Sequence, residues 1–215
     1  MTDPDQHARD LAANGGPTAW FDQLYVEAAA GAAVVPWDRG APHPVLIAWL
    51  AELDLDPRGR RALVVGCGLG EDAELLSGLG FATTAFDVSP GAVRAAGERF
   101  PASTVDYRVA DLLDTPAAWH RGFDLVVESM TVQAMPVSVR WTAIAHVREL
   151  VAPGGTLLVI AFARLDAEPG EGPPWGVSQG ELGSFAQDGL QALDVRGPHE
   201  TPDVLRWRAR FRRST

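Results

Sequence analysis

The sequence contains one cysteine and fewer basic than acidic residues. Cys67 stands alone among 215 residues, so it has no partner for an internal disulfide. Five scattered histidines and a single cysteine provide no zinc-type spacing, and we expect no structural metal. The formal net charge of −10 argues against a nucleic-acid-binding protein, because neutralising phosphates requires clustered Lys and Arg. A small-molecule partner is expected instead.

Membrane and targeting signals are also missing from the pattern. No apolar run reaches the ~18 residues of a membrane span. The N-terminal stretch MTDPDQHARDLAANGG has neither the basic region nor the apolar core of a secretion signal. These absences predict a cytoplasmic protein without membrane association. Nothing in the pattern indicates an oligomeric state.

The length and an apolar content of 47% favour a single domain over two. Residues 1–18 are polar and without periodicity, so we expect a flexible N-terminal tail. Residues 19–215 are expected to form the domain, and residues 19–55 to form a helical cap at its start. Two amphipathic segments, AWFDQLYVEAAAG and HPVLIAWLAEL, predict the helices of this cap. The loop VVPWDRGAP separates them.

From residue 62 onward, strand-like and helix-like segments alternate. Short apolar runs at 62–66, 83–87, 105–111, 123–128 and 154–163 are typical of strands, and amphipathic segments lie between them. This alternation predicts a Rossmann-like, doubly wound parallel sheet in a three-layer αβα arrangement. The segments ALDVRG and VLRWRARFRR form a closing pair. In the second, apolar residues alternate with arginines, which predicts a half-buried strand with an arginine face in solvent.

Three alternating glycines follow the first of these strands. Gly66, Gly68 and Gly70 fall at the carboxyl end of a parallel strand, where ligands of such sheets bind. A backbone without Cβ can turn tightly there and approach a ligand closely. Dinucleotide folds use G-x-G-x-x-G, whereas here Glu71 and Asp72 directly follow the third glycine. Two carboxylates would repel a pyrophosphate at the helix start, so a phosphate-free ligand with a positive group suits the loop better.

Acidic residues end the next two strands. Asp87 is placed to accept hydrogen bonds from two ribose hydroxyls, although an Asp turn before Ser89 would also account for it. Asp111 can accept from an adenine amino group, and Leu112 can cover a ring face. Together with the glycine loop, these positions predict a nucleoside that carries a cationic, phosphate-free arm. S-adenosylmethionine is such a molecule.

The segment from Trp37 to Phe162 resembles the class I S-adenosylmethionine-dependent methyltransferases. Within that superfamily, VPWDRGAPHPVLIAWL followed by VVGCGLGEDAELLSGLGFATTAFDVSPGAV is similar to the thiopurine S-methyltransferase-like group. The resemblance implies a seven-stranded sheet with the last strand antiparallel. It also implies S-adenosylmethionine as the cofactor and a small methyl acceptor, a thiol or thiopurine-like compound or another small aromatic molecule.

The resemblance and the strand-end pattern together assign two sets of site residues. The expected cofactor contacts are Trp20, Trp37, Gly66, Cys67, Gly68, Gly70, Asp87, Val88, Ser89, Asp111, Leu112 and Glu128. The expected acceptor contacts are Arg39, Met130 and Trp175, the last in a Pro/Gly-rich loop after the fifth strand. No residue matches a catalytic acid or base. A thiol with a pKa near ~8.5 is partly ionised at neutral pH and can react without one.

Several of these assignments have structural alternatives. Trp37 could be a core residue beneath the second cap helix, Trp175 could pack on its own helix, and Arg39 could form a surface ion pair. The function also has two alternatives. One is a non-catalytic S-adenosylmethionine-binding protein, and the other is a nicotinamide-dependent oxidoreductase, which would require the G-x-G-x-x-G spacing of the glycines.

Overall fold

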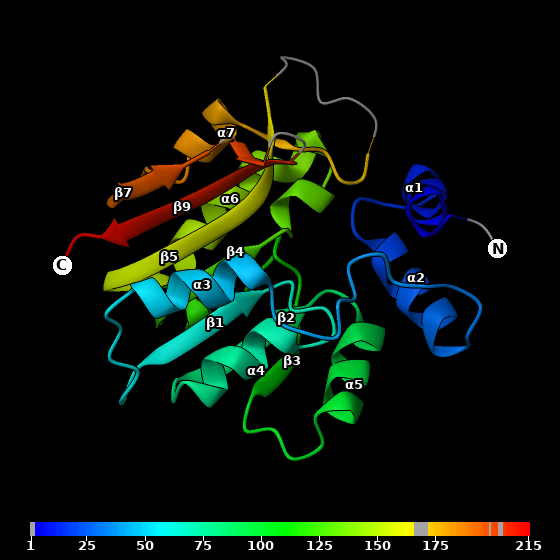
Figure 1. Cartoon of the computed structure of the whole chain (residues 1–215), viewed down its shortest axis with the longest axis horizontal. Coiled ribbons are helices and arrows are strands. Elements are labelled where there is room, and N and C mark those ends of the chain that lie inside the picture. Colours follow the sequence, from blue (N-terminus) through cyan, green and yellow to red (C-terminus); the bar gives the residue numbers. More distant parts are fainter. Residues whose placement is uncertain (1–2, 166–171, 198, 202–203) are drawn as a thin grey trace.

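The computed structural model describes residues 3–165, 172–197, 199–201 and 204–215. A twisted sheet forms its centre, with helices on both sides (Figure 1). The strand order is β3-β2-β1-β4-β5-β9-β7, and β6 pairs with β5 and β8 with β9 beside this path. The strands are β1 (Arg61–Val65), β2 (Ala82–Asp87), β3 (Asp106–Val109), β4 (Phe123–Ser129), β5 (Val151–Arg164), β6 (Val177–Ser178), β7 (Leu190–Arg196), β8 (His199–Thr201) and β9 (Val204–Arg213).

The expected sheet topology is confirmed. Strands β1 to β5 run parallel to one another, and β9 runs antiparallel to both β5 and β7. The last strand is therefore the reversed one. The helices are α1 (Pro4–Asn14), α2 (Ala19–Ala29), α3 (Pro44–Glu52), α4 (Glu71–Gly78), α5 (Pro90–Arg99), α6 (Val137–Leu150) and α7 (Gln179–Gly183), with 3-10 turns η1 (Ala117–Trp119) and η2 (Val132–Ala134).

Alternating strand residues create the three layers. On β1, Leu63 and Val65 belong to a core cluster that includes α6, whereas Ala62 and Val64 belong to a second cluster that includes α3 and α4. Successive side chains of a strand point to opposite faces. Because both faces of β1 are covered, its sequence is a continuous apolar run. Because β1 to β4 run parallel, their carboxyl ends lie at the same edge of the sheet. Ligands of such sheets bind at this edge.

Residues 1–18, for which the sequence predicts a flexible tail, include a helix. Helix α1 occupies Pro4–Asn14, and the side chain of Asp3 caps it by accepting a hydrogen bond from the Asp5 amide at 3.1 Å. Proline at the first helical position is compatible with this cap. Ala8 is buried in a cluster with Trp20 and Leu24 of α2. The helix therefore draws on a tertiary contact that its own polar sequence does not reveal.

The arginine face of β9 is also less solvated than expected. The Arg208 guanidinium lies 4.6 Å from the ring centroid of Trp49 on α3, and it pairs with Glu52 at the end of the same helix. Arg208 is thus a packing residue as well as a charge. Within the residues that the structure describes, no helix combines the length and apolar character needed to cross a membrane.

Candidate functional site

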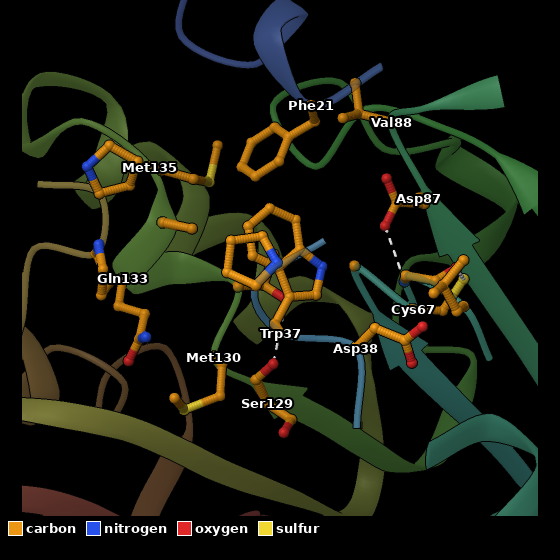
Figure 2. A pocket seen from close by; sticks show the side chains of 18 of the residues that line it. Phe21, Trp37, Asp38, Cys67, Asp87, Val88, Ser129, Met130, Gln133 and Met135 are labelled. Carbon is orange, nitrogen blue, oxygen red and sulfur yellow. Dashed lines mark hydrogen bonds between the residues drawn. The ribbon is translucent and has the colours of Figure 1, made fainter. Parts of the chain in front are cut away.

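A cavity of about 410 Å³ opens at the carboxyl edge of the sheet. Helices α1 and α2, the loop after α2, and the segments that follow β1, β2, β3 and β4 surround it. Most of the residues expected in the site line this cavity: Trp20, Trp37, Arg39, Gly66, Cys67, Gly68, Asp87, Val88, Asp111, Leu112 and Met130. Figure 2 shows several of them projecting toward its centre. The exceptions are Gly70, Ser89, Glu128 and Trp175.

The glycine loop supplies backbone to the cavity wall. Gly68 has a φ of +52°, in the left-handed region that favours glycine. A Cβ at this position would lie 3.1 Å from the Tyr25 hydroxyl, so the absence of a side chain keeps the loop close to α2. Gly70 has a different role, because it caps α4 and a Cβ there would collide with the Tyr107 hydroxyl. It serves helix packing rather than the cavity.

Asp87 connects the loop to the end of β2. Its Oδ2 accepts a hydrogen bond from the Gly68 amide at 2.9 Å, and its Oδ1 accepts one from the Ser89 amide at 3.0 Å (Figure 2 shows the side chain at the cavity wall). Burial raises the pKa of Asp87, and these two N–H donors oppose the rise. A carboxylate offers about four lone-pair sites, so Asp87 can form this turn and still accept from ligand hydroxyls.

Ser89 itself points away from the cavity and into the start of α5. Its Oγ accepts a hydrogen bond from the Ala92 amide at 2.9 Å and donates one to Asp22 Oδ1 at 2.6 Å. Asp22 also accepts from the Gly91 amide at 2.9 Å. The expected contact between Ser89 and a cofactor is therefore replaced by an N-cap that fixes α2 against α5.

An aromatic cluster closes the side of the cavity facing α2. The Trp37 indole donates a hydrogen bond to the Tyr25 hydroxyl at 2.8 Å, and its ring lies edge-on to Trp20 at 6.0 Å and to Phe21 at 6.2 Å between centroids. Trp37 thus packs in a core cluster and lines the cavity at the same time. Burial raises the pKa of Tyr25 well above its usual value, so the phenol stays neutral. Such rings attract a cation through their π faces.

The third strand end forms a flatter part of the wall. Asp111 accepts a hydrogen bond from the Leu113 amide at 2.8 Å, and the Leu112 carbonyl lies 2.7 Å from His146 Nδ1 of α6. Val88 and Phe86 line the cavity from β2 and the turn that follows it. An apolar surface with one carboxylate at its edge suits a planar base that bears an amino group.

Glu128 does not reach the cavity, contrary to the expectation that it contacts the cofactor. Its side chain is fully buried, and its Oε1 accepts hydrogen bonds from the Thr131 and Val132 amides at 2.9 Å each. Burial raises its pKa to about 7. Glu128 therefore anchors the turn after β4. Met130, within that turn, lines the cavity and has a φ of +67°, a conformation that is uncommon for a side chain of this size.

The loop after β5 contributes different residues from the one expected. Residues 166–171 lie outside the described part of the chain. Trp175 does not line the cavity, whereas Pro173 and Pro174 do. The Trp175 amide donates a hydrogen bond to the Gln133 carbonyl at 2.8 Å, which attaches this loop to η2. Trp175 thereby positions the wall without forming it.

The charges at the cavity mouth are arranged in pairs. Arg99 of α5 pairs with Asp38 at 2.8 Å and with Glu71, and Asp72 accepts a hydrogen bond from the His43 amide at 2.7 Å. The repulsion of a pyrophosphate expected from Glu71 and Asp72 is therefore partly offset. The G-x-G-x-G spacing remains as the feature that disfavours a dinucleotide.

His43 and Arg39 lie at the same mouth. Burial, together with Arg39 and Arg206, lowers the pKa of His43 to about 4, so its imidazole is neutral at physiological pH. Arg39 is exposed and lines the cavity, where it could attract an anion. Among the described residues, no three His, Cys, Asp or Glu side chains are grouped so that they could hold a metal ion.

Residues 62–155 match the family described as a methyltransferase domain. Over this region the chain is similar to methyltransferase domains. "Probable thiol methyltransferase 2" from Arabidopsis thaliana is 33% identical over 152 residues, which cover 70% of this chain and 66% of that protein. A ubiquinone biosynthesis O-methyltransferase from Xanthomonas campestris is 31% identical over 156 residues, covering 68% and 64%. The chain thus spans slightly less than two thirds of these relatives' lengths.

Solved structures support the same fold. One, described for the conversion of a disulfide bond into a thioacetal group during echinomycin biosynthesis, has a TM-score of 0.71 at 24% identity, with 90% of this chain and 92% of that chain covered. Another is a Burkholderia thailandensis 1,6-didemethyltoxoflavin-N1-methyltransferase with bound S-adenosylhomocysteine. It has a TM-score of 0.66 at 18% identity and covers 100% and 92%. These likenesses confirm the Rossmann-like fold expected for this chain.

Sequence reasoning missed Tyr25, Gln133, Met135 and Phe162, which all line the cavity. None of them lies at the end of one of the first three strands, where the pattern directed attention. A helical tyrosine twelve residues before Trp37 carries no motif of its own. Its role depends on the fold of the intervening loop.

Proposed function

We propose that the protein is an S-adenosylmethionine-dependent methyltransferase that acts on a small thiol or thiopurine-like acceptor, or on another small aromatic compound. One observation carries this proposal. The Asp87 carboxylate, which accepts a hydrogen bond from the Gly68 amide, lines the same cavity as the hydrogen-bonded rings of Trp37 and Tyr25. A buried carboxylate for ribose hydroxyls and an aromatic surface for a sulfonium are there in a single site. The relatives named as thiol and thiocyanate methyltransferases favour a sulfur acceptor.

The residues present fit such a cofactor. Asp87 would hold the ribose, Asp111 and Leu112 the adenine, and the Gly66–Gly68 backbone with Trp37 the methionine arm. When bound, the cofactor supplies a methyl group on a positively charged sulfur. The chain's own part is to hold the two reactants in line and to exclude water, which can supply a large share of a methyl-transfer rate.

The remaining half of the cavity is suited to an acceptor that needs no protein base. Met130, Met135 and Phe162 line it together with Gln133, and none of these side chains is a base. His43 also lines the cavity, but its low pKa makes it a weak base. A thiol is partly ionised near neutral pH, so its reaction does not depend on such a group.

A turnover panel tests this proposal. Purified protein is incubated with S-adenosylmethionine and, in turn, with alkyl thiols, thiophenol, 6-mercaptopurine, catechol and simple amines, and methylated products are measured by mass spectrometry. We expect transfer to thiols, with S-adenosylhomocysteine formed in equal amount. Binding of S-adenosylhomocysteine without any transfer would favour a non-catalytic binding protein. A thermal shift with NADH and none with S-adenosylhomocysteine would favour an oxidoreductase.

A further inference from the structure

The amide of Gln133 has a fixed orientation at the cavity wall. Gln133 lies in η2 and is 3% exposed. Its Oε1 accepts a hydrogen bond from the Phe162 backbone amide at 2.5 Å. A backbone N–H can only donate, so the oxygen of the side-chain amide must face Phe162. The Nε2 group, with two N–H donors, is consequently the end left for another partner, and the described residues offer it no hydrogen-bond acceptor.

The main chain around Gln133 is held from several directions. Its carbonyl accepts hydrogen bonds from the Trp175 amide at 2.8 Å and from Arg140 Nη2 at 3.4 Å. Arg140 is fully buried and also donates to the Met135 carbonyl at 3.0 Å. Glu128 fixes the preceding turn by its bonds to the amides after Met130. A donor on such a support is preorganised, so little ordering is needed when a ligand binds.

Two side chains on this side of the cavity, Met130 and Met135, are thioethers, and Arg206 Nη1 lies 3.5 Å from the Met130 sulfur. Figure 2 shows Gln133, Met130 and Met135 on one side of the cavity, with Trp37 between them and the wall formed by Asp87. The thioethers are polarizable, and a low-dielectric wall strengthens any hydrogen bond made there. Asp87, which would hold the ribose, lies on the other side of Trp37 in this view, so the Gln133 side is left for the methyl acceptor.

Arg9 on α1 places a positive charge at the same cavity. Arg9 lines the same cavity, and its Nε is buried without a hydrogen-bond partner among the described residues. A partly buried guanidinium in a cavity favours an anionic ligand. The donor of Gln133 and the charge of Arg9 therefore both suit an acceptor that binds in its ionised form.

We propose that Gln133 is a specificity-determining residue whose Nε2 group donates a hydrogen bond to the reacting sulfur of the acceptor, bound as a thiolate. This inference rests on the proposed methyltransferase function. The thiol proton passes to solvent before transfer. A sulfur lone pair of the thiolate then forms a bond to the methyl carbon, as the bond between that carbon and the cofactor sulfur breaks. The electrons of that bond stay on the cofactor sulfur, and both products are neutral at sulfur.

Donation to a thiolate has opposing effects on rate, and their balance depends on pH. Lowering the thiol pKa by about one unit raises the thiolate fraction about tenfold at pH values below that pKa. Nucleophilicity falls only about threefold, taking the Brønsted coefficient of ~0.4–0.5 found for thiolate exchange. The hydrogen bond is therefore a net gain of about threefold at low pH and a loss once the thiol is fully ionised. A residue with a purely structural role would not produce this crossover.

The test compares Gln133→Met and Gln133→Glu with the unaltered protein. Single-turnover methyl transfer to 2-mercaptoethanol is measured from pH 6 to 10. For Gln133→Met, we expect the inflection of the rate–pH profile to move up by about one pH unit. Its rate should be lower than that of the unaltered protein at low pH, and this difference should shrink toward high pH. Gln133→Glu keeps an oxygen for the Phe162 amide but replaces the donor, so its rate near pH 7 should fall about 10- to 100-fold. The exposed Gln191→Glu change is the matched control.

The outcomes separate this inference from the function on which it rests. Affinity for S-adenosylhomocysteine should be the same in all four proteins. An equal loss at every pH in Gln133→Met, or an unaltered rate in Gln133→Glu, would overturn the role of Gln133 and leave the methyltransferase proposal intact. If Gln133→Met fails to bind S-adenosylhomocysteine, the isosteric Gln133→Glu carries the test. Absence of transfer to any thiol by the unaltered protein would overturn both proposals.

Discussion

Replacing Glu128 by glutamine should change how folding stability depends on pH. In the folded protein this carboxyl is fully buried and accepts hydrogen bonds from the Thr131 and Val132 amides through Oε1. Its Oε2 is buried without a partner among the described residues. Burial raises its pKa from 4.5 to about 7. The ionised form is thus the disfavoured one in the fold.

The direction of the effect follows from proton linkage. Between pH 4.5 and about 7, the folded state binds more protons at Glu128 than the unfolded state does, so stability falls as pH rises through this window. The pKa shift of Glu128 corresponds to about 3 kcal/mol of folding stability. This stability is fully present below pH 4.5 and is lost in full once the pH exceeds about 7. Glutamine keeps an oxygen for the two amides but does not titrate. Relative to the unaltered protein, Glu128→Gln should therefore gain up to about 3 kcal/mol between pH 4.5 and pH 8.

Urea denaturation of both proteins at pH 5 and pH 8 measures this difference. Other titrating groups are common to the two proteins and cancel in the comparison. A stability difference that stays constant across the pH range would refute the assignment of a high pKa to Glu128. Titration with S-adenosylhomocysteine serves as the functional check. A large loss of cofactor affinity in Glu128→Gln would mean that the side chain contacts the cofactor after all.

Two further substitutions test the walls of the cavity. Gly66→Ala places a side chain at a φ of +59° against Thr131, and should lower the free energy of unfolding by more than the ~1–2 kcal/mol of backbone strain alone. Gly31→Ala, at a φ of +72° with nothing within 4 Å, is the strain-only control in urea denaturation, and equal losses would contradict the clash. Trp37→Phe keeps a ring but removes the 2.8 Å bond to Tyr25, so calorimetry should show about 2- to 10-fold weaker binding of S-adenosylhomocysteine. Unchanged affinity would show that this bond does not position the site.

The sheet and the side of the cavity formed by the glycine loop and the strand ends can be predicted from the sequence because their signals are local. A strand covered on both faces reads as an apolar run, as Ala62–Val65 does. The carboxyl ends of parallel strands lie at the same edge of a sheet. Gly68, Asp87 and Asp111 lie at such ends and line one cavity. No distant contact is needed for either inference.

The rest depends on side-chain directions and on distant partners. Glu128 ends a strand as Asp87 does, but its carboxylate turns back to the amides of the following turn. Gln133 acquires its orientation from the Phe162 amide, 29 residues away. Helix α1 is stabilised by burial of Ala8 against α2. This contact cannot be predicted from the short polar segment alone. Such features become visible only when the chain is folded.

Calorimetric titration of S-adenosylhomocysteine into the unaltered protein and into Asp87→Ala tests the central claim most directly. We predict micromolar binding to the former and at least a 100-fold weaker affinity for the latter, on the order of two lost hydrogen bonds to a carboxylate. Unchanged binding in Asp87→Ala, or no heat from the unaltered protein at millimolar ligand, would rule out a cofactor site built on Asp87.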